Sequence, residues 1–331
     1  EEFQSRTRAA PGLTNHVPGL RYQDVGGRIR HQQKLNEPVE DADEHRDVIL
    51  IPRCMESLGL DYQVLFPGNM LGLGTHQQPR IEAQLAYAYD RFVVERILPG
   101  DSRIKTLLYL PLNEPDQCIR IIEEFGESPG VLGFMVTSVR FKPVHHNAYI
   151  PIYKMLEERG LPLAFHAGPN WTDDYMKQLD LFISMHAISF VLCNMVHLTN
   201  WIIQGMPERF PRLKVIWIES GVAWIPFMMQ RLDSEYLMRS SEAPLLKKLP
   251  SEYMRDMFFS SQPIETSNMA LLEATMTAMK AETQMLYASD WPHWDFNPPS
   301  TIYDLPFLDD AAKRNILGGN AARLFNLPLR E

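Results

Sequence analysis

From Arg46 onward the chain alternates short apolar runs with longer amphipathic segments. The apolar runs predict strands at residues 62–66, 104–110, 131–139, 161–166, 213–219, 257–260 and 285–289. The amphipathic segments predict helices at residues 47–58, 79–98, 114–125, 147–159, 185–204, 224–239 and 269–281, with further helix from residue 309. Gly59 and Gly160 follow two of these segments, as glycine commonly does at the end of a helix.

This alternation predicts a parallel sheet, because a helical crossover returns the chain so that successive strands run in the same direction. The strands lack a clean apolar-polar alternation, which is typical of a sheet covered on both faces. Seven strand-helix units favour an α/β fold, the (β/α)8 TIM barrel, with a first strand that is absent from this sequence or hidden in it. A doubly wound open sheet is the alternative. The absence of a glycine-rich phosphate loop disfavours its nucleotide-binding form, and with it a nucleotide-dependent oxidoreductase.

Residues 1–45 differ from the rest, because they are polar, rich in Pro and Gly, and end in an acidic stretch. We interpret them as an irregular surface excursion and residues 46–331 as the barrel. A chain of 331 residues is compatible with a single α/β barrel domain.

The formal net charge of −9 disfavours binding to nucleic acid or to an anionic membrane, since both require a basic surface. We expect no apolar stretch long enough to span a membrane, because the longest, residues 185–203, is broken by two histidines and two asparagines. Three scattered cysteines favour a reducing compartment, which predicts a cytoplasmic protein. A small molecule is the expected partner.

Polar residues stand at the ends of several predicted strands, and in a parallel barrel these ends meet at one mouth. His166 ends one strand and Asp290 follows another. Each has an alanine two residues earlier, Ala164 or Ala288, which would lie on the same face of the strand. An imidazole facing a carboxylate suits a divalent metal such as Zn²⁺, and Asp290 could act both as a ligand and as a base.

Either Glu219 or Ser220 could point into the barrel at the end of the strand predicted at residues 213–219. If Glu219 points inward, Trp217 must fill the barrel, whereas an inward Ser220 leaves that space to Ile216 and Ile218. We favour Glu219 as a catalytic residue, with a supporting hydrogen-bonding role as its alternative. His293, three residues after Asp290, is a further catalytic candidate or else caps the loop backbone.

Five residues are candidates for substrate binding. Asn170 and Trp171 closely follow His166 and could line the binding site of a planar compound, although simple packing is the commoner role of Trp. Arg140, His145 and His146 follow the strand at residues 131–139 and could bind a carboxylate. His197, in contrast, has the spacing of a core histidine.

Four segments together resemble the amidohydrolase-related branch of the amidohydrolase superfamily, over about residues 44–327. They are Phe165-His166-Ala167-Gly168, Arg209-Phe210-Pro211-Arg212-Leu213-Lys214-Val215, Ser289-Asp290-Trp291-Pro292-His293-Trp294-Asp295, and the closing segment from Asn315 to Phe325. The resemblance implies a (β/α)8 barrel with His166 and Asp290 as metal ligands. The family includes aminocarboxymuconate-semialdehyde, resorcylate and carboxyvanillate decarboxylases and assorted hydrolases.

Two departures from that family pattern stand out. The family's first strand carries a His-x-His pair or an acidic variant of it, but this chain has only the adjacent His145-His146, in the wrong place. The missing strand lies upstream of residue 1, or the sequence was written down without it, or the metal site is degraded. Secondly, Glu219 stands where many of these decarboxylases have the histidine that handles the proton.

We therefore expect a metal-dependent enzyme that decarboxylates a small carboxylated aromatic or unsaturated compound without oxidation. The expected cofactor is one divalent ion, zinc in the first place, with manganese or another ion as the alternative. A metal-dependent hydrolase of a C–N or C–O bond and a catalytically silent barrel that binds a ligand remain open. Methionine and aromatic residues on the helix at 224–239 favour a homo-oligomer.

Overall fold

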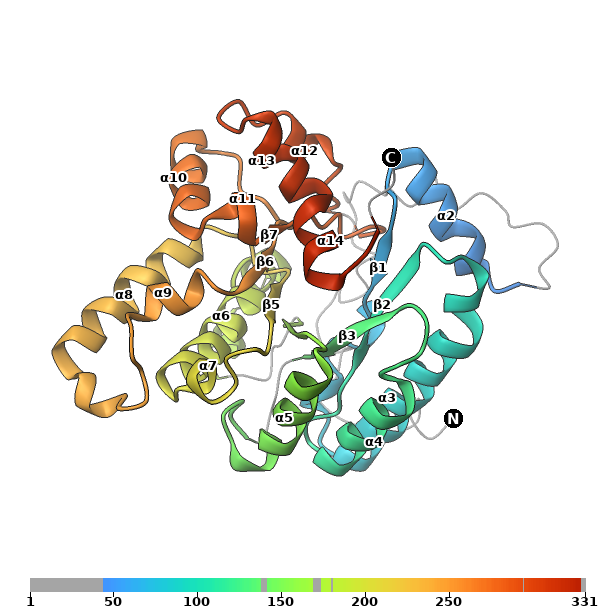
Figure 1. Cartoon of the computed structure of the whole chain (residues 1–331), viewed down its shortest axis with the longest axis horizontal. Helices are drawn as coiled ribbons and strands as arrows, with labels where there is room; N and C mark the ends of the chain where they lie inside the picture. Colours follow the sequence, from blue (N-terminus) through green and yellow to red (C-terminus); the bar gives the residue numbers. More distant parts are fainter. Residues whose placement is uncertain (1–43, 138–141, 169–173, 180, 294, 329–331) are drawn as a thin grey trace. The chain divides into compact units, whose positions relative to one another are not determined.

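The structure, a computed structural model, describes residues 44–137, 142–168, 174–179, 181–293 and 295–328 (Figure 1). Its strands belong to one seven-stranded sheet, in which they follow one another in sequence order. The strands are β1 (Gln63–Leu65), β2 (Ile104–Tyr109), β3 (Val131–Val136), β4 (Leu163–His166), β5 (Val215–Ile218), β6 (Phe258–Ser260) and β7 (Met285–Leu286). All seven predicted strands are present, each of them shorter than the sequence pattern indicates.

The described part of the chain divides into two compact units, of which the first takes its described residues from the ranges 44–142, 166–190 and 292–293. Here β1 pairs in parallel with β2, and β2 with β3. Strands β2 and β3 are almost entirely buried, with Leu107, Leu108 and Phe134 fully enclosed, whereas β1 is partly exposed. The helices of this unit are α2 (Arg46–Leu58), α3 (Pro79–Phe92) and α4 (Pro115–Phe125), and Figure 1 shows α3 and α4 side by side.

One predicted helix of the first unit is broken into three pieces. The segment predicted at residues 79–98 is α-helical only as far as Phe92, and continues as a π-helical turn η4 (Val93–Ile97) and a 3-10 turn η5 (Leu98–Gly100). Three further 3-10 turns are short: η2 (Gly68–Met70) and η3 (Leu73–Thr75), which follow β1, and η7 (Met176–Gln178). The turns η2 and η3 belong to the loop at the carboxyl end of β1.

The second unit comprises residues 143–165, 191–291 and 295–331. In it β5 pairs in parallel with β6, and β6 with β7, while the Leu163 amide of β4 donates to the Lys214 carbonyl just before β5. Its α-helices are α5 (Ile150–Arg159), α7 (Met206–Arg209), α8 (Trp224–Arg239), α9 (Pro250–Met254), α10 (Met269–Met279), α11 (Ala281–Gln284), α12 (Ser300–Tyr303), α13 (Asp310–Arg314) and α14 (Asn320–Phe325). Its shorter turns are η6 (Asn147–Tyr149), η8 (Ser240–Glu242) and η9 (Asn315–Gly319).

The core of the second unit is built around aromatic side chains. Phe165 of β4 stacks on Trp217 of β5, with ring centroids 4.7 Å apart. Trp201 of the helix that follows β4 meets Phe165 edge-on at 5.5 Å. Trp217 therefore packs on the side of the sheet that this helix covers. The expectation that Trp217 must fill the barrel if Glu219 is inward was wrong for this reason.

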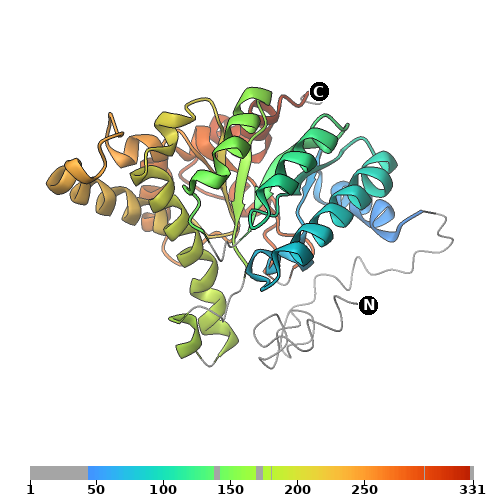
Figure 2. The same ribbon diagram turned by 90° about the horizontal axis from the view of Figure 1, so that it is seen from below.

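The helix between β4 and β5, α6 (Phe182–Ile203), is long and carries no charged residue. Residues 183–203 are long and apolar enough to cross a membrane by length and composition, so the expectation that no stretch reaches that length was wrong. Such a helix is weak evidence for a span, and 39% of its apolar window is buried inside the protein. Asn194 and His197 are among its buried residues, which confirms the prediction of a core position for His197. Figure 2 shows α6 as one continuous helix.

Candidate metal and active site

Glu219 is the first residue after β5, and the backbone turns sharply there. Its φ is 52°, which lies in the left-handed region that residues other than glycine rarely adopt. The Glu219 amide donates to Ser260 Oγ at the end of β6, over 2.9 Å. The side chain is only partly buried. The turn thus ends the strand alternation and presents the carboxylate at the carboxyl end of β5.

Ser220 is buried and supports this turn rather than competing with Glu219 for the site. Its hydroxyl donates to the Ile218 carbonyl at 3.1 Å and accepts a hydrogen bond from the Asn194 side chain of α6. Asn194 also donates to the Ile218 carbonyl at 3.0 Å. At the next position, Gly221 has a φ of 67°, and a Cβ there would lie 2.2 Å from a Glu265 carboxylate oxygen. The positions of Ser220 and Gly221, just beyond the end of β5, are therefore both set by specific contacts.

Asp290 lies four residues beyond β7, also in a left-handed turn with a φ of 57°. Hydrogen bonds continue past the strands: the Ser261 amide donates to the Leu286 carbonyl at 2.9 Å, and the Ala288 amide donates to Ser261 Oγ at 3.0 Å. Gln262 Nε2 then donates to Asp290 Oδ2 at 3.2 Å. The segment after β6 thereby fixes the carboxylate that follows β7.

The loop after Asp290 is closed by Asn297. The Asn297 amide donates to the Ser289 carbonyl at 2.8 Å, and its side-chain oxygen accepts from the Ile264 amide at 3.2 Å. The Tyr287 hydroxyl donates to the Asn297 carbonyl at 2.8 Å. His293 belongs to this closed loop.

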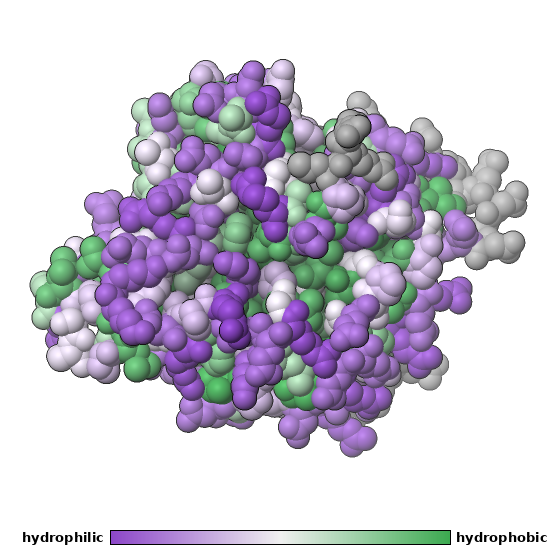
Figure 3. All heavy atoms as spheres, in the orientation of Figure 1, coloured by the Kyte–Doolittle hydropathy of each residue, from purple (hydrophilic) through white to green (hydrophobic). Residues whose placement is uncertain are grey.

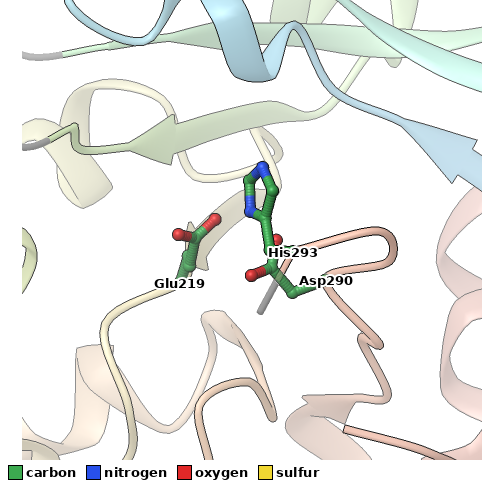
Figure 4. A group of neighbouring side chains, drawn as sticks. All are labelled: Glu219, Asp290 and His293. Carbon is green, nitrogen blue, oxygen red and sulfur yellow. The ribbon is translucent and has the colours of Figure 1, made fainter. Parts of the chain in front are cut away.

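Glu219, Asp290 and His293 form one group of potential metal ligands. One ligand atom from each lies within 4.8 Å of the others, and all three side chains are partly buried. Figure 4 shows the two carboxylates and the imidazole turned toward a common space. The structure thus brings together the three predicted catalytic residues. Two carboxylates and one imidazole form a donor set that fits a divalent ion such as Zn²⁺ or Mn²⁺.

Backbone strain is concentrated at this group. Among the described residues, four that are not glycine have a positive φ, and two of these, Lys280 and Asn326, cap the ends of helices. The other two are Glu219 and Asp290. A left-handed conformation costs a non-glycine residue about 1–2 kcal/mol and tends to persist where function requires it.

His166, the predicted metal ligand, ends β4 and is buried. Its Nδ1 lies 2.8 Å from the Ala167 carbonyl oxygen, which can only accept, so Nδ1 carries the proton and Nε2 presents a lone pair. This arrangement is typical of metal-binding histidines. His166 is not a member of the group formed by Glu219, Asp290 and His293, and its sharing of a metal with Asp290 stays a prediction.

Two predicted substrate-binding histidines stand before α5. His146 caps η6, because its Nδ1 accepts a hydrogen bond from the Ala148 amide at 3.1 Å. Burial, reinforced by the neighbouring His146, lowers the pKa of His145. Substrate binding by these two residues stays a prediction. The other candidates, Arg140, Asn170 and Trp171, lie outside the described residues.

A second acidic cluster, in the first unit, was not predicted. The Glu82 carboxylate of α3 accepts from the Tyr109 hydroxyl at 2.8 Å and from Asn113 Nδ2 at 2.6 Å. Tyr109 Oη also lies 3.3 Å from Thr137 Oγ1. Asp90, further along α3, accepts from the Tyr109 amide at 3.0 Å.

Both acids of this second cluster are deeply buried. Burial raises the pKa of Glu82 to about 7, against the opposing effect of its hydrogen bonds from Tyr109 and Asn113. Burial likewise raises the pKa of Asp90 well above its usual range. The cluster therefore consists of acids that favour the protonated, neutral form.

Comparison with known proteins places these observations in a family. The family described as Amidohydrolase matches residues 43–327. A gamma-resorcylate decarboxylase from Polaromonas is 20% identical over 246 residues, which make up 71% of this chain and 74% of that protein. A 2-amino-3-carboxymuconate-6-semialdehyde decarboxylase from Dictyostelium discoideum is 22% identical over 275 residues, or 81% of this chain and 73% of that protein.

Solved structures show the same fold. A 5-carboxyvanillate decarboxylase from Novosphingobium aromaticivorans, complexed with manganese and 4-hydroxy-3-methoxy-5-nitrobenzoic acid, has a TM-score of 0.74. The two sequences are 18% identical, and the match covers 98% of this chain and 90% of the other. With the parallel sheet in sequence order, this likeness confirms the predicted (β/α)8 barrel fold.

Proposed function

We propose, given that this chain belongs to the amidohydrolase family, that it is a metal-dependent carboxy-lyase that removes CO2 from a small carboxylated aromatic compound. The observation that carries the proposal is the grouping of Glu219, Asp290 and His293 at the carboxyl ends of parallel strands. The decarboxylases that match this chain in sequence and in fold support the choice of reaction.

Asp290 and His293 would hold the divalent ion, with Glu219 beside it, and His166 is the further proposed ligand. When bound, such an ion polarises oxygen atoms of the substrate and so favours a build-up of negative charge. The residues of the chain supply the acid and the base. Asp290 has a carboxylate oxygen fixed by Gln262, and Glu219 is held by its backbone in a turn.

Decarboxylation breaks the bond between the ring carbon and the carboxyl carbon, and the ring carbon must then gain a proton. We assign this proton delivery to Glu219, because it takes the position of the family's usual histidine and is partly exposed. Asp290 would accept a proton from a substrate hydroxyl. His145 and His146 are retained as proposed contacts of the substrate carboxylate, together with Arg140, Asn170 and Trp171.

The identity of the ion is a separate proposal. An oxygen-rich group with a single imidazole suits manganese as well as the zinc that the sequence favoured. The related 5-carboxyvanillate decarboxylase carries manganese. Elemental analysis of purified protein, followed by reloading of the metal-free protein with each ion, would separate the two.

The test of the proposed function is CO2 release from a panel of ortho-hydroxylated aromatic acids. We expect turnover of at least one panel member, abolished by a chelator and restored by Mn²⁺ or Zn²⁺. Hydrolysis of amide or ester panel members without CO2 release would instead establish the hydrolase alternative. A protein that binds neither ion would support the catalytically silent barrel.

We also propose a homo-oligomer in a reducing compartment, the cytoplasm. Trp224, Met228 and Met229 of α8 are buried, but Phe227 is 50% and Met238 70% exposed. Figure 3 shows apolar surface at the left, over the region of α8. None of the three cysteines, all within the described residues, forms a disulfide. Light scattering during gel filtration would measure the mass, and a monomer at micromolar concentration would refute the oligomer.

A further inference from the structure

Gln262 lies two residues beyond β6 and is almost completely buried, with 1% of its surface exposed. Its side-chain nitrogen donates twice, to Asp290 Oδ2 at 3.2 Å and to the Asp295 carbonyl oxygen at 3.4 Å. An amide group has two hydrogens to donate. Both donors of Gln262 are therefore directed at the segment from Asp290 to Asp295, which also carries His293.

These two acceptors determine which way the amide of Gln262 is turned. The opposite orientation would place its carbonyl oxygen against a carboxylate oxygen and a backbone carbonyl, neither of which can donate. In the observed orientation, Gln262 Oε1 is buried and has no hydrogen-bond partner among the described residues. A buried acceptor without a partner costs about 1–3 kcal/mol.

An apolar side chain of similar length, such as methionine, would avoid that cost. Packing alone therefore does not explain glutamine at this position, whereas its two donated hydrogen bonds do. One of them reaches a proposed metal ligand, and the other fastens the loop that carries a second one. Groups that bond to metal ligands in this way fix the ligand's orientation.

We infer that Gln262 is a positioning residue for the metal site: it engages Asp290 Oδ2, so that Oδ1 is presented to the ion, and it holds the loop of His293 through Asp295. The inference rests on the proposed function of Asp290 as a ligand. Gln262 does not itself contact the ion or the substrate. Its effect is therefore on metal affinity, with little effect on the stability of the metal-free protein.

The experiment compares the metal-free protein with its Gln262→Met and Gln262→Glu variants. Mn²⁺ binding is measured by electron paramagnetic resonance of the free ion, and unfolding of the metal-free protein by circular dichroism. We expect Gln262→Met to bind Mn²⁺ about 10–100-fold more weakly, the usual effect of losing a partner of a metal ligand. Gln262→Glu should bind it more weakly than wild type too, because it loses both donors.

Gln284→Met is the matched control. Gln284 Nε2 donates to the Met257 carbonyl at 3.1 Å, at the opposite ends of the same two strands, β6 and β7. This variant should lose stability without any change in Mn²⁺ affinity. Wild-type Mn²⁺ affinity in either folded Gln262 variant would overturn the inference. If the unsubstituted protein binds no Mn²⁺ or Zn²⁺, the proposed function itself fails, which is a distinct result.

Discussion

The chain has two pairs of acidic residues in contrasting settings: Glu82 and Asp90 in the first unit, and Glu219 and Asp290 in the second. Glu82 and Asp90 lie on a regular helix, are buried, and accept hydrogen bonds from Tyr109. Glu219 and Asp290 stand in left-handed turns just beyond strands and are partly exposed. All four are carboxylic acids, but the backbone and the burial around them differ completely.

The contrast teaches how to separate a structural acid from a functional one. At Glu82 the surroundings favour the neutral form, and a neutral acid is a poor metal ligand. At Glu219 and Asp290 the backbone is strained and the side chains are accessible, which is the pattern of a site kept for chemistry. The same residue type thus occurs once in a buried hydrogen-bonded network and once at the proposed metal site.

Asp290→Asn is expected to have the largest effect. Removing the charge weakens metal binding and removes the base, so turnover should fall by roughly two to four decades. Decarboxylation of the best panel acid and the metal content of the purified variant are the measurements.

Asp304→Asn is the control for Asp290→Asn, because Asp304 is an exposed aspartate at the end of α12. It should retain metal and activity. Full metal content with near-normal turnover in Asp290→Asn would show that the second acidic pair is not functional, and the contrast between the two pairs would disappear.

Glu82→Gln is expected to change how stability depends on pH. The pKa of Glu82 is raised to about 7 in the folded protein from 4.5, so the folded state binds the proton more tightly. The stabilisation of the folded protein by proton binding at Glu82 is therefore fully present below about pH 4.5. The free energy of unfolding falls as the pH rises to about 7, by on the order of 3 kcal/mol. The Gln variant should lack this fall, as measured by urea unfolding at a series of pH values.

The control for Glu82→Gln is Glu123→Gln on the exposed side of α4, which should keep the wild-type pH dependence. Glutamine can preserve the network at residue 82, since its amide can accept from Asn113 and donate to Tyr109. Parallel pH curves for the wild type and Glu82→Gln would mean that Glu82 is not the neutral acid that the comparison requires.

Asn194→Ala is expected to have the smallest effect of the three. It removes two hydrogen bonds that hold the end of β5, to the Ile218 carbonyl and to Ser220 Oγ. The free energy of unfolding should drop by about 1–3 kcal/mol, because a buried carbonyl loses a donor. Thr199→Ala, on the same helix, should cost less, because the Thr199 hydroxyl bonds, among the described residues, only to the Met195 carbonyl of its own helix. Equal losses in both variants would argue against a special role for Asn194 at the Glu219 turn.

The fold could be predicted because its signals are local. Each strand lies in a predominantly apolar run, and glycine marks helix ends where the backbone requires a positive φ, as at Gly59 and Gly160. The π-helical turn at Val93–Ile97 could not be predicted, because its residues have the pattern of a continuing helix. The helix α6 was predicted at residues 185–204, close to its observed bounds, but its length as an apolar stretch was discounted because its histidines and asparagines were taken as breaks.

The candidate site was predicted in part. Strand alternation applies to His166, which lies within β4, but not to Glu219 and Asp290, which lie beyond the ends of β5 and β7. The choice between Glu219 and Ser220 therefore could not be made by counting residues. Gln262 and Asn194 escaped notice because nothing in sequence marks an amide that bonds to a distant strand end.

The buried acids of α3 illustrate the same limit. Glu82 and Asp90 carry no local sign of burial, and their partner Tyr109 lies on another element. Only the packing of α3 on β2 reveals them. The sequence thus shows which side chains can carry a charge, whereas their neighbours in the fold determine whether they do.

The left-handed turn at Glu219 has a consequence for laboratory evolution. Glycine adopts this conformation without the steric penalty of a Cβ, so Glu219→Gly would relieve about 1 kcal/mol of strain while deleting the carboxylate. With the role proposed for Glu219, stability and activity are opposed at this position. A library selected only for heat resistance should enrich glycine at residue 219. Selection for a more heat-resistant enzyme must therefore also require turnover in every round.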